Sequence, residues 1–210
     1  MSIQLQSRTI DGVAGVDEAG RGPWAGPVMT AAAVLTTDAV APLEAIGVND
    51  SKTLTRAARE RCFDVILEQQ SLGNLWLVVE AGDVKEIDTH NILQATMRAM
   101  ARAVTALPVP PSHALIDGNR TPDLPCSSEA IVGGDGKILS IATASIAAKV
   151  TRDRLMAKLA SAHPGYGWER NAGYGTAEHR RGLETHGVTK HHRRSFAPIR
   201  KFLEEPTTSR

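Results

Sequence analysis

Four acidic residues stand at or just after the ends of short apolar runs in this sequence: Asp17, Glu18, Asp117 and Asp135. Carboxylates that are brought together repel one another, which raises the pKa of at least one of them unless divalent cations lie between them. Hard oxygen ligands favour magnesium or manganese. Two such ions about 4 Å apart can activate water and stabilise the leaving oxygen when a phosphodiester is hydrolysed. The four acids therefore predict a metal site for phosphodiester hydrolysis.

The adjacent pair poses a geometric difficulty. Successive side chains of a strand point to opposite faces, so Asp17 and Glu18 cannot both face one metal site from regular strand geometry. We expect either that the strand bends at Glu18 or that Glu18 contributes through its backbone carbonyl.

Glycines and histidines of the chain suggest other sites, which their spacing does not support. The glycines at 20, 22 and 26 miss the dinucleotide-binding spacing by one residue, and the segment 133–137 lacks the first glycine and the Ser/Thr of a phosphate-binding loop. Histidines 186, 191 and 192 have no cysteine neighbours, so zinc is not indicated. We interpret these histidines as part of a basic region.

That basic region spans residues 176–201 and contains seven Lys or Arg residues but only two acids, on a chain with a net charge of +1. It suits a phosphate-bearing partner, although a solvated helix face explains the charge alone equally well.

Composition bounds the class of protein. With 210 residues, 42% of them hydrophobic, the chain can form one well-buried domain and a small appended element. Cys62 and Cys126 are far apart and predict neither a disulfide framework nor a zinc ribbon. The first ten residues lack a secretory pattern, and no apolar run approaches the ~20 residues of a membrane helix. We expect a soluble, cytoplasmic protein that does not bind membranes.

The elements that must position the acids alternate along the chain. Apolar runs predict strands at 13–17, 27–35, 75–80, 114–117 and around 131, with a hairpin between the first two. Helical spacing predicts helices at 55–70, 89–107, 140–160 and 176–185, with Thr89 and Ser140 as N-caps of the second and third. Such alternation favours an α/β architecture around a central sheet, in which ligands gather beyond strand ends.

Seven motifs occur in order over most of the chain: Val16-Asp-Glu-Ala-Gly-Arg-Gly-Pro23, Asn49-Asp-Ser-Lys52, Leu115-Ile-Asp-Gly118, Gly134-Asp135, Ala144-Ser-Ile-Ala-Ala-Lys-Val-Thr-Arg-Asp153, Gly173-Tyr-Gly-Thr-x-x-His179 and His192-Arg-Arg-Ser-Phe196. Together they resemble the ribonuclease HII family of type 2 ribonucleases H. The resemblance implies an α/β, RNase H-like fold, with a central mixed β-sheet flanked by helices and a small C-terminal helical extension.

The resemblance also implies an activity. The family hydrolyses the RNA strand of RNA/DNA hybrids and cuts 5′ to single ribonucleotides embedded in duplex DNA. Two-metal hydrolysis with Mg²⁺ or Mn²⁺ would leave 5′-phosphate and 3′-hydroxyl ends, a chemistry that serves DNA replication and ribonucleotide excision repair. We expect a monomer whose partners are these duplexes; a replication or transcription partner is left open.

Carried over residue by residue, the family's catalytic and metal-binding acids are Asp17, Glu18, Asp117 and Asp135. The substrate-binding positions would be Gly20, Arg21 and Gly22 for the ribose 2′-hydroxyl, Tyr174 for the sugar at the RNA–DNA junction, and Ser51, Lys52 and Lys149 for phosphates.

Asp153 is the competitor for the fourth ligand position. It lies between two arginines in the middle of a predicted helix, where a structural ion pair is the commoner role. We therefore prefer Asp135.

On this basis we expect residues 1–160 to form the catalytic domain, 161–203 a basic substrate-binding extension, and 204–210 a flexible tail. Two alternatives stay open at this point. A DNA-cleaving or strand-transfer enzyme on a similar fold would not need a 2′-hydroxyl sensor, and a non-catalytic hybrid-binding module would not need four acids.

Overall fold

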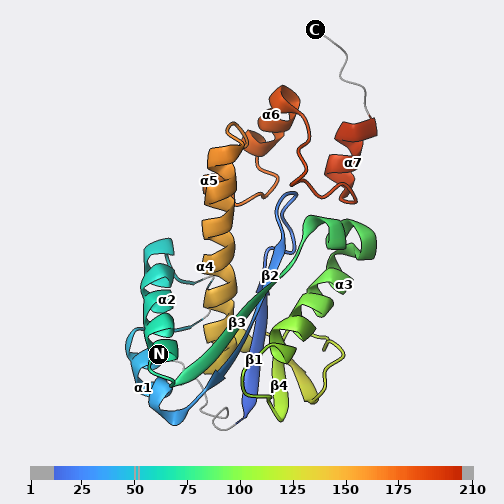
Figure 1. The fold of residues 1–210 in the computed structure, drawn as a ribbon. Helices are drawn as coiled ribbons and strands as arrows, with labels where there is room; N and C mark the ends of the chain where they lie inside the picture. The colour runs from blue at the N-terminus through green and yellow to red at the C-terminus, as the bar shows by residue number, and fades with distance from the viewer. Residues whose placement is uncertain (1–11, 50, 52, 205–210) are drawn as a thin grey trace.

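The computed structural model describes residues 12–49, 51 and 53–204 (Figure 1). Its strands are β1 Val13–Ala19, β2 Val28–Leu35, β3 Leu75–Gly82, β4 His113–Asp117 and β5 Ser127–Ile131. Its helices are α1 Thr37–Ala45, α2 Arg56–Ser71, α3 Val84–Thr105, α4 Leu139–Ala162, α5 Trp168–Asn171, α6 Ala177–His186 and α7 Ala197–Glu204, with a 3-10 turn, η1, at Gly134–Gly136.

The five strands form one mixed sheet in the order β3-β2-β1-β4-β5. β1 and β2 form the predicted antiparallel hairpin, and β3 pairs antiparallel to β2. β4 and β5 extend the sheet in parallel beyond β1. Helices α2 and α4 cover one face of this sheet and α3 covers the other (Figure 1), which is the α/β architecture that the sequence predicts.

The two-residue period of β1 divides its side chains between the two faces. Ala14 and Val16 pack into the cluster that contains Met100 and Val104 of α3. Gly15 faces α4 instead, where an added Cβ would collide with the backbone of Ile141. The long helix α4 can therefore lie directly on the strand that carries Asp17.

The start of α3 differs from the prediction. The helix begins at Val84, and its N-cap is Asp83, whose side chain accepts a hydrogen bond from the Glu86 amide. Thr89 is not a cap, because its hydroxyl donates to the Lys85 carbonyl one turn earlier within the helix. Asn91 interrupts the helix with a φ of 68°, so the capping residue near the predicted start is Asn91, which accepts from the Gln94 amide.

The start of α4 also corrects a prediction. Ile138 is the N-cap, so Ser140 lies inside the first turn. The Ser140 hydroxyl is buried and has no hydrogen-bond partner among the described residues. Helices α1, α5 and α7 lie outside the predicted helices, and Glu204, placed in the tail by the sequence, ends α7.

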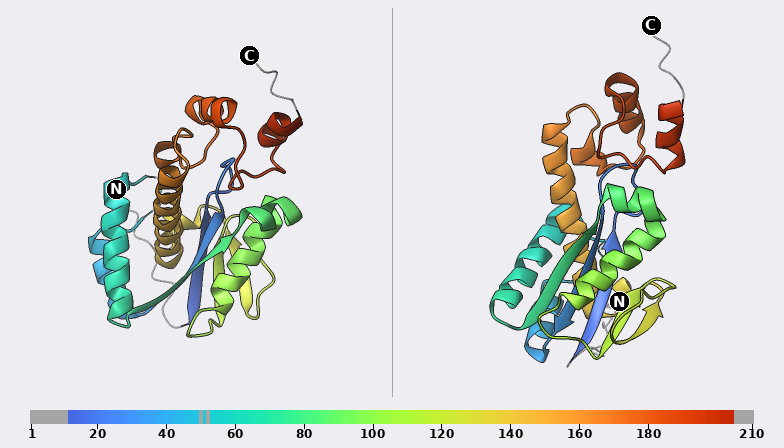
Figure 2. Two further views of the ribbon diagram at one scale, coloured as in Figure 1. Left: turned by 45° about the horizontal axis from the view of Figure 1, so that its top comes forward. Right: turned by 45° about the vertical axis from the view of Figure 1, so that its right-hand side comes forward.

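The C-terminal elements α5, α6 and α7 lie at one end of the molecule, where the turn between β1 and β2 reaches them (Figure 2). The Trp24 amide donates to the Gly173 carbonyl at 2.8 Å, and the Arg193 amide donates to the Trp24 carbonyl at 2.8 Å. A single β-bridge joins Ala25 to His192. The turn between β1 and β2 is therefore enclosed by residues from the C-terminal part of the chain.

No helix within residues 12–49 and 53–204 combines the length and the hydropathy needed to cross a bilayer.

Candidate active site

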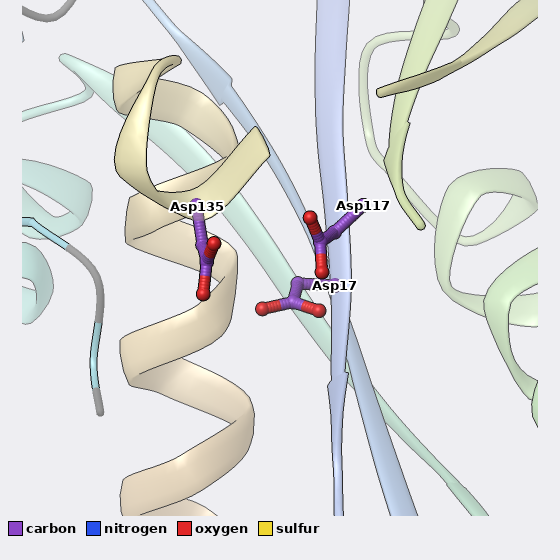
Figure 3. A group of neighbouring side chains, drawn as sticks. All are labelled: Asp17, Asp117 and Asp135. Atoms are coloured by element: carbon purple, nitrogen blue, oxygen red, sulfur yellow. The ribbon is translucent and has the colours of Figure 1, made fainter. Parts of the chain in front are cut away.

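Three of the predicted acids meet beside the sheet (Figure 3). Val16 pairs with Ile116 on the adjacent parallel strand, so Asp17 and Asp117 occupy the next position on β1 and β4. The Gly134 amide donates to Asp117 Oδ1 at 2.7 Å, which holds η1 against the strand end and brings Asp135 in. One carboxylate oxygen from each aspartate lies within 4.8 Å of the other two.

The electrostatics of Asp17 favour a bound cation. Asp17 is 3% exposed, and burial, together with the charges of Glu18 and Asp117, raises its pKa well above the ordinary value. A hydrogen bond from Ser145 and another from the Glu18 amide, at 2.7 Å, partly oppose that rise. A divalent cation would relieve the repulsion, and three converging carboxylates are the hard donor set that Mg²⁺ and Mn²⁺ accept.

Ser51 supports this site from behind. It is buried, and its hydroxyl oxygen lies 2.8 Å from that of Ser145, the residue that hydrogen-bonds Asp17. Because Ser145 donates to the carboxylate, Ser51 is the donor to Ser145. The direct phosphate contact predicted for Ser51 stays a prediction, and Lys52 lies outside the described residues. Ser145 is not among the residues predicted for the site, and its only signal in the sequence is its place in the fifth motif.

Glu18 is not part of the three-aspartate group. β1 keeps its antiparallel register with β2 through Glu18 and Ala19, so strand pairing shows no break at the position where a bend was one alternative. The Glu18 side chain forms an ion pair with Arg21 at 3.3 Å. A contribution of Glu18 through its backbone carbonyl stays a prediction.

The Gly20–Gly22 turn follows β1 directly. Gly20 has a φ of +95°, and an added Cβ would collide with the side chain of Arg152, so this position requires glycine. A Cβ on Gly22 would lie 3.4 Å from Cε1 of Tyr174, which places that ring beside the turn. Tyr174 is 47% exposed and the Arg21 side chain 49%. The structure thus places Tyr174 beside the Gly20–Gly22 turn, the two features predicted to contact the sugar.

A hydrogen-bonded pair of neutral histidines, His179 and His192, holds the backbone at Tyr174. His179 Nδ1 donates to the Tyr174 carbonyl at 3.0 Å, so Nε2 of His179 is the acceptor for Trp168 Nε1 at 3.1 Å and for His192 Nε2 at 3.0 Å. The Thr189 amide donates to His192 Nδ1 at 2.9 Å. Both rings are therefore uncharged.

Burial lowers the pKa of both rings, to about 3 for His192. The interpretation of His192 as part of the basic region is wrong, because the residue is 1% exposed and its ring is neutral. A buried histidine and an exposed one look alike in a single sequence.

Lys149 and Asp153 pair with each other in α4. Lys149 Nζ donates to Asp153 Oδ1 at 2.7 Å, and Arg59 lies 3.9 Å from Oδ2 of the same carboxylate. Asp153 therefore takes part in ion pairs, as predicted. The phosphate contact of Lys149 stays a prediction.

Comparison with known proteins places the chain among the ribonucleases H. The sequence model of the family described as Ribonuclease HII matches residues 14–199. Ribonuclease HII of Ruegeria pomeroyi is 54% identical over 192 residues, which cover 91% of this chain and 78% of that protein. Ribonuclease HII of Jannaschia sp. is 55% identical over 192 residues, with 91% and 92% covered.

A solved structure agrees. The crystal structure of ribonuclease H2 from Pyrococcus horikoshii superposes with a TM-score of 0.77 at 29% identity, over 91% of this chain and 97% of that one. Its fold is the RNase H-like arrangement of a mixed sheet flanked by helices. With its acidic cluster, this chain belongs to the ribonuclease HII family and is a metal-dependent endonuclease, a hydrolase with ribonuclease H activity on RNA/DNA hybrids.

Proposed function

We propose that this endonuclease cuts on the 5′ side of single ribonucleotides embedded in duplex DNA, as well as within longer RNA/DNA hybrids, and leaves 5′-phosphate and 3′-hydroxyl ends. The observation that carries this proposal is the order of residues at one strand end. β1 supplies Asp17 to the acidic group, and the glycine-arginine-glycine turn begins directly after β1 ends at Ala19. A ribose bound at the turn therefore lies next to the carboxylates.

The acids would share the metal-binding work. Asp17, Asp117 and Asp135 present converging carboxylate oxygens, and Glu18 adjoins them through its backbone. Bound there, two Mg²⁺ or Mn²⁺ ions would supply an activated water and stabilisation of the leaving 3′-oxygen. The hydrogen bonds from Ser145 and from the Gly134 amide fix two of the three carboxylates in place.

The turn and Tyr174 would read the sugar. Backbone groups of residues 20–22 can approach a 2′-hydroxyl because Gly20 and Gly22 carry no side chain. The exposed Tyr174 ring beside Gly22 offers a flat apolar surface for the neighbouring sugar. Exposed Arg and Lys side chains of α6 and α7 would contact phosphates without reading the sequence, and Lys149 would do the same.

One cleavage assay tests this function. A labelled DNA duplex with a single ribonucleotide is compared with the same duplex made entirely of DNA, each with Mg²⁺, with Mn²⁺ and with EDTA. We expect one cut, 5′ to the ribonucleotide, that requires metal, and no cut in the all-DNA duplex. Equal cleavage of both duplexes would favour a DNA-cleaving enzyme. Binding of hybrids without metal-dependent cleavage would indicate a binding module.

A further inference from the structure

The turn of residues 20–22, called the recognition turn below, is held from its buried side by one arginine. Arg193 Nη2 donates to the Gly20 carbonyl at 2.6 Å, Nη1 to the Arg21 carbonyl at 2.7 Å, and Nε to the Gly26 carbonyl at 2.9 Å. We propose that Arg193 is a positioning residue for 2′-hydroxyl recognition, because these contacts set the direction of the backbone groups in the turn. This inference rests on the proposed function.

The chemistry of arginine suits this position. Arg193 is fully buried, and burying a guanidinium is costly unless its N–H groups are hydrogen-bonded. The three backbone carbonyls satisfy donors on all three of its nitrogens. Burial, with the charge of nearby Arg152, lowers the pKa of Arg193 to about 9, so the group stays charged at neutral pH. Lysine carries its donors on a single nitrogen and cannot span three separated carbonyls.

The direction of the carbonyls fixes the direction of the amides. The described peptide bonds are trans, and in a trans peptide the C=O and the following N–H point in opposite directions. The Gly20 and Arg21 carbonyls point inward to Arg193, so the N–H groups of Arg21 and Gly22 point outward. Both of these residues are exposed. By holding these carbonyls, Arg193 thus orients the amides of Arg21 and Gly22 as two adjacent donors for the oxygen of a bound ribose or phosphate.

The segment that carries Arg193 is anchored independently of the turn. Asp88 of α3 accepts hydrogen bonds from the Arg194 amide at 3.0 Å, from the Ser195 amide at 2.9 Å and from the Ser195 hydroxyl at 2.7 Å. Arg193 is therefore fixed to the helical layer and can hold the turn in one orientation.

A second buried arginine provides a matched control. Arg152 is 1% exposed and donates to three backbone carbonyls, those of Ala25, Pro27 and Ala172. None of these carbonyls belongs to residues 20–22. Arg193→Lys and Arg152→Lys therefore remove similar buried networks, but only the first removes hydrogen bonds to the carbonyls of Gly20 and Arg21. Arg152 touches the turn only through the packing of its side chain against Gly20.

The test measures binding, so that it does not depend on catalysis. In an Asp17→Asn background, fluorescence anisotropy gives the Kd for the single-ribonucleotide duplex and for the all-DNA duplex. The Kd for the all-DNA duplex divided by the Kd for the single-ribonucleotide duplex measures ribose recognition. We expect Arg193→Lys to lower this ratio about fivefold, the value of one well-formed hydrogen bond, with less than a twofold change in all-DNA binding. Arg152→Lys should lower the Tm as much and keep the ratio within twofold.

The outcomes separate the two proposals. An unchanged ratio in Arg193→Lys, or an equal loss in Arg152→Lys, overturns the positioning role of Arg193 and leaves the proposed function standing. Equal binding of both duplexes by the parent protein overturns 2′-hydroxyl recognition itself, and the role of Arg193 falls with it.

A milder pair covers the case in which Arg193→Lys does not fold. Asp88→Ala loosens the segment that carries Arg193, whereas Asp83→Ala removes another carboxylate of the same helix that caps α3 alone. We expect Asp88→Ala to lower the binding ratio about twofold to threefold and Asp83→Ala to leave it unchanged. Equal ratios in the two variants would overturn the proposal.

Discussion

At the scale of single residues, burial raises the pKa of the Asp17 carboxyl, and repulsion from its acidic neighbours raises it further. We predict that Asp17→Asn abolishes metal-dependent cleavage and leaves the Tm equal or higher, because the amide keeps the shape of the side chain and removes a buried charge. Cleavage assays and thermal unfolding check this pair of results. Unfolding together with the loss of activity would show that Asp17 serves core packing instead.

Gly20 and Gly47 separate backbone strain from steric contact. Both have positive φ, +95° and +82°, but a Cβ on Gly20 would meet the side chain of Arg152, whereas one on Gly47 would meet nothing within 4 Å. We predict that Gly47→Ala costs about 1 kcal/mol of stability, the strain alone, and that Gly20→Ala costs more and lowers cleavage at least tenfold. Urea unfolding and initial rates measure the two effects. Similar stability losses would contradict the steric argument.

The sequence could predict the acids but not all of their neighbours. Asp17 and Asp117 end apolar runs, and this pattern alone places them at one edge of a sheet. Ser145 can bond Asp17, and Arg193 can bond the turn, only because a particular side of a helix or loop meets the strand. Local sequence does not determine which side that is. Arg193 lies among exposed cations in the sequence, so only tertiary structure identifies it as buried.

At the scale of elements, helix caps show the same limit. Thr55 and Thr176 cap α2 and α6 where the sequence places the helix starts. Thr89 and Ser140 do not cap, although both belong to the residue types that favour this role. α3 extends to an earlier cap at Asp83, which is a local feature, whereas Ser140 is buried by a tertiary contact, where α4 crosses Gly15.

Ser140 yields a stability prediction for α4. Its buried hydroxyl has no partner among the described residues, and an unsatisfied buried hydroxyl costs about 1–3 kcal/mol. We predict that Ser140→Ala raises the free energy of unfolding by about 1 kcal/mol, as measured by urea denaturation. Thr143→Ala is the control: its hydroxyl donates to the Leu139 carbonyl, so its removal should not stabilise the helix. A loss of stability in Ser140→Ala would show that the hydroxyl has a partner.

The hydrogen-bonded pair of His179, in α6, and His192, in the following loop, makes stability depend on pH. His179 and His192 have lowered pKa values in the folded state, and the groups packed around them include Tyr166, Trp168, His163 and His191. The unfolded chain therefore binds more protons below the ordinary histidine pKa of 6.5. Stability is fully present above that pH and falls as the pH drops from 6.5 toward about 3.

Urea unfolding between pH 8 and pH 5 measures this dependence. His192→Gln should reduce the slope between pH 6 and pH 5 by up to about 1.4 kcal/mol per pH unit, the contribution of one proton. His90→Gln, at an exposed histidine of α3, is the control for the loss of an imidazole in itself. An equal slope in His192→Gln and the parent would show that the ring is charged in the folded protein.

At the scale of the whole molecule, charge is unevenly distributed. The net charge is +1, but the C-terminal elements carry exposed cations at Arg180, Arg181, Lys190, Arg194, Arg200 and Lys201. We predict that duplex binding weakens steeply with salt and that Lys201→Ala reduces the slope of log K against log salt by about one. Anisotropy titrations at several salt concentrations measure the slope. A response that is flat with salt would remove the C-terminal elements from the binding surface.

The enclosure of the β1–β2 turn by residues 191–193 links the two ends of the chain in time as well as in space. The carbonyls of Gly20 and Arg21 lie 173 and 172 residues from Arg193 in sequence. Because a chain emerges from the ribosome N-terminus first, the sheet and its three aspartates can form while the turn still lacks its support. A nascent chain in this state holds the hydrolytic acids but not the fixed turn beside them, so ribose recognition would be completed only when synthesis has passed residue 193.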